Sequence, residues 1–268
     1  MPRPADRALP RLLIGLAVLL ALVTLVAPLA LIFAAAFARG WQVYAANILD
    51  PATLHAIFLT VLTAVIVVPV NLVFGVATAW AVARYEFPGR KLMIALIEIP
   101  FSVSPIVAGT IYLFLYGSQG LLGPTLQDWG VQIMFSIPAI ILVSLFVTAP
   151  FVARELIPLM QAQGSEDEEA ALSLGASPWQ TFRLVTLPNI RFALLYGAVL
   201  TNARAMGEFG AVSVVSGNIR GQTNTLPLQI ELLFNDFNTV GAFAAASTLA
   251  LIAVATLVLK VLLERPAA

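Results

Sequence analysis

The chain has 268 residues, of which 60% are hydrophobic and 10% are charged, and its mean hydropathy is +0.95. Soluble domains carry about 25% charged residues, so the composition excludes an ordinary cytoplasmic enzyme and a disordered chain. The 14 Lys and Arg are balanced by 14 Asp and Glu, which leaves no basic surplus for a nucleic-acid partner. The composition predicts an all-α integral membrane protein with one transmembrane domain, residues 1–268, in contact with membrane lipid.

Six apolar stretches are long enough to cross a bilayer, which takes about 20 residues. The first is too long for the 7–15 apolar residues typical of a signal peptide, so we interpret it as a retained helix. The predicted spans are Leu12–Ala38, Leu54–Ala83, Leu92–Tyr116, Ile133–Val152, Phe192–Ser216 and Val240–Leu263.

Positive residues are distributed unevenly between the two sides that six spans define. Eleven of the 14 fall on one side, whereas Arg39 and Arg220 fall on the other and Arg204 lies inside a span. Lys and Arg favour the cytoplasmic side, so both termini are predicted to be cytoplasmic. The eleven are Arg3, Arg7, Arg11, Arg84, Arg90, Lys91, Arg154, Arg183, Arg191, Lys260 and Arg265.

The chain has no Cys and only one His, His55. Disulfides, thiol nucleophiles and Cys-based zinc sites are therefore excluded, and no metal site is predicted. We interpret His55 as a polar residue near the start of a helix.

Proline and small polar residues interrupt the third predicted span between Pro100 and Pro105. Freed carbonyl groups are tolerated in membranes where protein or a water-filled path satisfies them, so this span is predicted to line a cavity. The alternative is close helix packing through small residues. The predicted pathway residues are Ser102, Ser104, Thr110, Arg204 and Glu208, with Asn71 and Asn202 as weaker candidates.

The longest polar segment, residues 154–191, reads as two short helices. Ser165 and Glu168 have the spacing of a capping box, and Gly175 can end the first helix in the left-handed conformation. Ser177 then caps a second helix that is predicted to run to about Leu187 and to stop at Pro188. This helix pair could dock on a cytoplasmic partner protein. The alternative is a surface helix pair that packs on its own membrane domain.

This segment resembles the EAA signature of permease subunits of bacterial ABC importers. Glu169-Ala170-Ala171, Gly175 and the Val185-Thr186-Leu187-Pro188 run have the family spacing, with Val185 in place of the usual Ile. The resemblance implies a type I ABC importer permease whose loop, about 161–189, docks on an ATPase subunit. The residues that it implies for this coupling are Glu169, Ala170, Ala171, Gly175, Ala176, Ser177, Leu187 and Pro188.

A wider resemblance to sulfate and thiosulfate permeases covers about Leu54 to Lys260. The segments that carry it are Pro100–Gly109, Thr148–Met160, Ala203–Val212 and Gly217–Glu231. It implies a multi-pass inner-membrane protein with three partners: a homologous second permease, an ATPase dimer and an extracytoplasmic anion-binding protein. A permease for another oxyanion such as molybdate, or a channel or carrier without an ATPase, remains the alternative.

Three charged residues, Glu98, Arg204 and Glu208, fall well inside predicted spans. Arg204 and Glu208 are placed to form an i,i+4 ion pair near the middle of the membrane, although Arg204 could instead attract an anion in the pathway. Glu98 is predicted to pair with a basic residue on another helix. The sequence lacks a G-x4-G-K-[ST] phosphate-binding loop, so ATP is expected to bind to the partner subunits and no cofactor to this chain.

Overall fold

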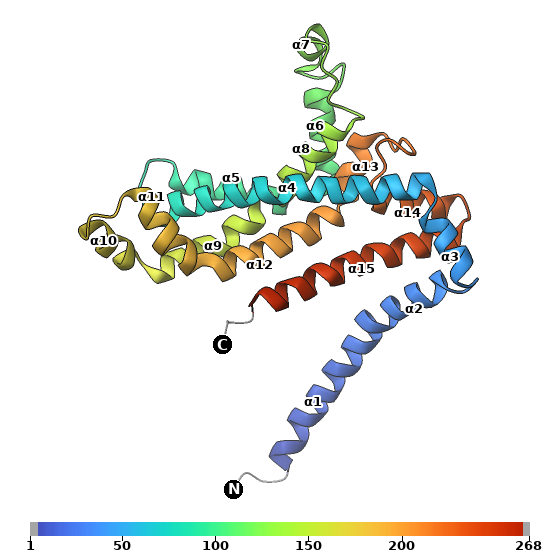
Figure 1. The fold of residues 1–268 in the computed structure, drawn as a ribbon, viewed down its shortest axis with the longest axis horizontal. Helices are drawn as coiled ribbons and strands as arrows, with labels where there is room; N and C mark the ends of the chain where they lie inside the picture. The colour runs from blue at the N-terminus through green and yellow to red at the C-terminus, as the bar shows by residue number, and fades with distance from the viewer. Residues whose placement is uncertain (1–4, 265–268) are drawn as a thin grey trace.

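The computed structural model describes residues 5–264, and Arg3 and Arg265 of the predicted cytoplasmic set lie outside this range. This part of the chain is helical and contains no strand (Figure 1). Two π-helical turns, Leu22–Val26 and Phe182–Thr186, join consecutive helices. The α-helices are α1 Ala5–Ala21, α2 Ala27–Ala36, α3 Trp41–Ile48, α4 Pro51–Arg84, α5 Arg90–Ser102, α6 Pro105–Tyr116, α7 Gly123–Asp128, α8 Ile137–Thr148, α9 Pro150–Gln163, α10 Glu166–Ser173, α11 Pro178–Thr181, α12 Leu187–Met206, α13 Gly210–Ser216, α14 Leu226–Asn235 and α15 Thr239–Glu264.

Five helical segments in the described range are long and apolar enough to cross a membrane. The predicted third span is not straight, because α5 and α6 meet at a bend of 109° and count as one broken span or a re-entrant loop. Pro105 explains the break, since a residue before proline is driven out of the helical conformation, and Ser104 has φ −57° and ψ 137°. The five segments are Leu12–Ala36, Pro51–Arg84, Ile137–Gln163, Pro178–Met206 and Thr239–Val258.

The predicted fifth span, Phe192–Ser216, also differs from the structure. Its helix begins upstream at Pro178, and it ends at Met206 before α13 starts at Gly210. The prediction that a helix stops at Pro188 was wrong. The π-helical turn just before α12 explains this, because its wider hydrogen-bonding pattern accommodates a residue that has no N–H.

Small residues let three long helices pack closely. A Cβ atom on Gly75 of α4 would lie 2.5 Å from Cβ of Val152 on α9, and one on Gly197 of α12 would lie 3.2 Å from Cα of Val152. Val152 itself is fully buried. Glycine at both positions therefore permits α4, α9 and α12 to meet around one side chain.

The first membrane span has a different environment from the rest. All side chains from Leu12 to Leu31 are exposed in the isolated chain, and α1 projects away from the other helices (Figure 1). An apolar surface of this length requires lipid or another protein around it.

Different loops and short helices lie at the two ends of the long helices. The α4–α5 loop and the turn between α10 and α11 lie toward the left of Figure 1, whereas α3, α13 and α14 lie toward the right. At the right-hand end, Nε2 of His55 lies 3.0 Å from the carbonyl oxygen of Gln222. His55 is thus a polar residue in the first turns of α4, as predicted.

Candidate functional site

The glycine corner predicted between the two short polar helices is present. Gly175 has φ +88°, a conformation that side chains with Cβ disfavour. Its N–H donates to the carbonyl of Leu172, and the N–H of Ala176 donates to the carbonyl of Ala171, both at 3.0 Å. A Cβ on Gly175 would meet no atom within 4 Å, so the requirement for glycine comes from the backbone alone.

The two predicted helix caps, Ser165 and Ser177, have different outcomes. At Ser177 both bonds of a capping box form: the Ser177 N–H donates to Oε1 of Gln180 at 2.8 Å, and the Gln180 N–H donates to Oγ of Ser177 at 3.3 Å. At Ser165 the prediction was wrong, because its hydroxyl donates to the carboxylate of Glu169 instead. The reason is that Glu168, the expected capping partner, turns inward to other residues.

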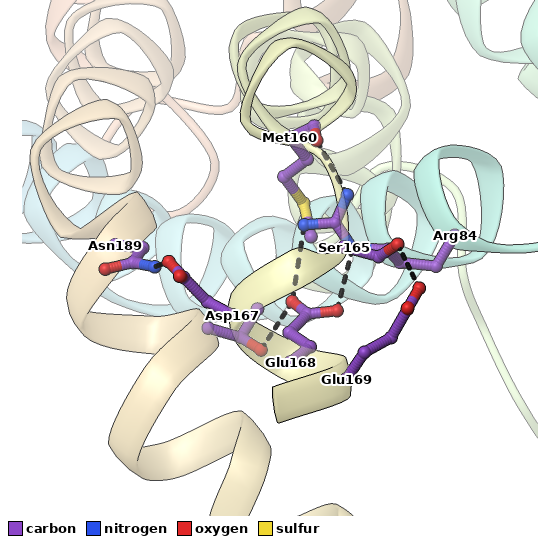
Figure 2. A network of polar contacts seen from close by, with 8 residues as sticks. Arg84, Met160, Ser165, Asp167, Glu168, Glu169 and Asn189 are labelled. Carbon is purple, nitrogen blue, oxygen red and sulfur yellow. Dashed lines mark hydrogen bonds and ion pairs between the residues drawn. The ribbon is translucent and has the colours of Figure 1, made fainter. Parts of the chain in front are cut away.

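Glu168 binds Arg84, the last residue of α4 (Figure 2). Nε of Arg84 donates to Oε2 of Glu168 at 2.8 Å, and Nη2 donates to Oε1 at 3.3 Å. The remaining Nη1 donates to the carbonyl of Met160 at 2.6 Å, and the hydroxyl of Thr186 donates to Glu168 Oε1 at 2.7 Å. Sequence reasoning missed this cluster, since the pair is separated by 84 positions and no local spacing reveals it.

The outer surface of this segment carries the residues of the EAA pattern. Glu169, Ala170 and Ser177 are exposed, and so are the larger side chains of Leu174 and Trp179, at 90% and 67%. Leu174 lies outside the candidate membrane spans, and an exposed large apolar residue there indicates a protein contact surface. Leu187 and Pro188, which the same pattern includes, lie in the first turn of α12 instead.

The two helix breaks within the membrane domain lie side by side. A Cβ on Gly210, the first residue of α13, would lie 3.3 Å from Cβ of Pro105 and from Cγ1 of Ile106. Pro105 begins α6, so the starts of α6 and α13 are neighbours. Ser102 and Ser104 lie at the α5–α6 break, and both are exposed.

Other predicted pathway residues bond within the chain. The Thr110 hydroxyl donates to the Ile106 carbonyl at 2.9 Å, the alternative expected for a hydroxyl in a helix. Asn71 is buried and donates to Oγ1 of Thr148 at 2.7 Å, so the structure does not place it on a cavity. The Asn202 amide lies 3.5 Å from Sδ of Met206.

Arg204 and Glu208 form the predicted ion pair. The Glu208 side chain is 1% exposed and that of Arg204 is 31% exposed. Oε1 of Glu208 also accepts a 2.9 Å hydrogen bond from the N–H of Ala211 in the first turn of α13. Because α12 ends at Met206, the pair lies at the helix break and joins α12 to α13.

Glu98 forms no ion pair with any residue in the described range, so the predicted ionic partner is not found. It lines a cavity of about 270 Å³ together with Arg154 of α9. The guanidinium carbon of Arg154 lies 4.9 Å from the ring centre of Phe101 in α5. Arg154, the basic residue that shares this cavity with Glu98, thus makes a cation–π contact with Phe101 and no ion pair with Glu98.

The apolar helices, the two adjacent breaks and the polar helix pair together define a membrane permease domain. Residues 71–267 match the model of the family described as "Binding-protein-dependent transport system inner membrane component". The chain belongs to this family of inner-membrane components of ABC importers.

Several relatives align along almost the whole chain. It is 60% identical over 252 residues to the sulfate transport system permease protein CysW of Escherichia coli K12, covering 94% of this chain and 87% of the relative. The CysW protein of Synechocystis is 50% identical, with 95% and 92% coverage. The CysT permease of E. coli K12 is 35% identical, with 91% and 88% coverage.

The solved structures confirm the fold. A chain of a bacterial ABC transporter involved in the import of alginate superposes with a TM-score of 0.81 at 16% identity, covering 98% of this chain and 97% of that one. A second alginate transporter structure, in complex with a periplasmic protein, gives 0.80 at 17% identity. The permease architecture predicted from the EAA resemblance is thus confirmed.

Proposed function

We propose that this chain is one of two permease subunits of an ATP-driven importer for sulfate and thiosulfate. The observation that carries the proposal is the 60% identity to a sulfate permease across 94% of the chain. The lower identity to CysT of the same species favours CysW-like over CysT-like function. A CysT-like subunit is then the homologous partner with which this chain encloses the pathway.

Energy for transport comes from partner subunits in this proposal. Two ATPase copies bind and hydrolyse ATP beneath the membrane domain, and the surface formed by α10, Gly175 and α11 docks on one of them. An extracytoplasmic protein delivers the anion. Closure of the ATPase dimer then pushes the docked helices and switches the side on which the pathway opens.

Uptake of labelled sulfate by the purified complex in liposomes tests this function. The complex should contain this chain, its permease partner and the ATPase, with binding protein and ATP supplied on their respective sides. Unlabelled thiosulfate should compete, whereas molybdate should not. ATP-dependent uptake of molybdate without uptake of sulfate would support the other oxyanion, and failure to co-purify with an ATPase would support a carrier of another class.

A further inference from the structure

The first short polar helix, α10, is attached to the membrane domain in an unusual way. None of its eight residues is buried, so no apolar core holds it in place. Its attachment is polar instead: Glu168 binds Arg84 and Thr186, and Asp167 accepts a 3.2 Å hydrogen bond from Asn189 (Figure 2).

The contact between Glu168 and Arg84 is shielded and geometrically complete. The two side chains are 13% and 10% exposed, and the paired nitrogens of the guanidinium meet both carboxylate oxygens. Such bidentate pairs fix orientation as well as distance. An exposed ion pair has far less effect, because water screens it and the side chains remain mobile.

The cluster joins four elements at one point. Arg84 ends α4, Met160 belongs to α9, Glu168 belongs to α10, and Thr186 lies in the π-helical turn that precedes α12. A displacement of α10 therefore reaches three membrane helices through a single carboxylate.

We propose that Glu168 and Arg84 are positioning residues that make α10 move as one body with the cytoplasmic end of α4. This inference rests on the proposed docking of α10 on an ATPase. The exposed residues of α10 contact the ATPase, and the shielded pair passes their displacement to the membrane helices. Without the pair, the ATPase can displace α10 while the membrane helices that form the pathway keep their positions.

Glu168→Gln tests the proposal in the complete complex. Sulfate uptake per ATP hydrolysed should fall by roughly tenfold, the scale of coupling lost through an intermediate contact, while ATP hydrolysis per assembled complex is retained. Glu86→Gln is the matched control, because Glu86 forms an exposed ion pair with Arg90 only two residues beyond Arg84. It should leave the ratio unchanged.

A covalent link separates mechanical connection from simple loss of charge. The chain has no native Cys, so Arg84→Cys with Glu168→Cys can be joined by a reversible bis-thiosulfonate reagent that matches the lost side chains in length. Coupling should return with the link and disappear when it is reduced. An unchanged uptake ratio in Glu168→Gln, or no recovery on linking, overturns the proposal.

A distance measurement keeps the proposal testable if Glu168→Gln fails to assemble. Spin labels at Glu86→Cys and Glu166→Cys, with Glu168 intact, should give the same distance in the nucleotide-free and vanadate-trapped complex. A shift between these states overturns the inference. The wild-type complex controls for the function itself: without sulfate uptake there, the proposed substrate fails, whereas the distance test still stands.

Discussion

A carboxylate buried in a membrane domain is costly unless charge and hydrogen bonds compensate for it. Glu208 has both kinds of compensation, from the guanidinium of Arg204 and from the N–H of Ala211. The second contact places negative charge at the start of α13, where the helix dipole favours it. Glu208 is therefore a structural connection across a helix break as well as a partner for Arg204.

Replacing one member of this pair should harm assembly more than replacing both. Arg204→Leu leaves the buried Glu208 carboxylate without its counter-ion, at a cost of about 3–5 kcal/mol, whereas Glu208→Met leaves a guanidinium that is 31% exposed and should cost less. The double variant should recover most of the assembled complex, but not all of it, because the Ala211 N–H loses its acceptor at a cost of about 1–3 kcal/mol. The yield of purified complex from each of the three variants measures how well each one assembles.

Sulfate uptake by the same three variants separates pairing from anion contact. Full assembly of both single variants would contradict the pairing. If the double variant assembles but transports poorly, Arg204 also serves the anion, whereas full uptake in that variant excludes this role.

At the scale of elements, the corner at Gly175 sets the angle between α10 and α11. Gly175→Val should reduce uptake per ATP hydrolysed, because a β-branched residue resists positive φ, and the open space around the position excludes a steric cause. Gly175→Asn should be milder, since Asn tolerates this region. Gly130→Val is the matched control, with φ +67° and equally open surroundings outside the coupling segment; an equal loss there would contradict the specific role.

The neighbouring breaks at the starts of α6 and α13 suggest where the pathway runs. Single cysteines at Ser102 and Ser104 should react with water-soluble thiol reagents in at least one nucleotide state, because these side chains are exposed at the α5–α6 break. Asn71→Cys should stay unreactive as the buried control. If neither Ser102→Cys nor Ser104→Cys reacts in any state, the pathway assignment is wrong.

The sequence predicted those features that depend only on residues close together in the chain. The turn at Gly175 and the capping box at Ser177 depend on residues within a few positions of one another, so their spacing was sufficient. The sequence predicted a single span across Ser104 and not a sharp bend there, because hydropathy is averaged over a window that extends across the helix break. Glu168 was misassigned because its spacing to Ser165 fits a cap equally well, and only the folded chain brings Arg84 to it.

The whole molecule presents different chemistry at its two ends. The proposed docking surface of α10 and α11 lies at the same end as the α4–α5 loop (Figure 1), which is flanked by Arg84 in α4 and by Arg90 and Lys91 in α5. At the other end, the described Lys and Arg residues are Arg39 before α3 and Arg220 before α14. This asymmetry supports a cytoplasmic location for the docking end.

Labelling from the two sides of the membrane tests this orientation. Leu174 and Phe237 are suitable positions because they are 90% and 93% exposed and follow α10 and α14, which lie at opposite ends of the molecule (Figure 1). An impermeant thiol reagent should label Leu174→Cys only in inverted vesicles and Phe237→Cys only in spheroplasts, whereas both should react after permeabilisation. The reverse pattern would place α10 and α11 outside the cell, where no ATPase could dock, so it would contradict the orientation and the coupling role together.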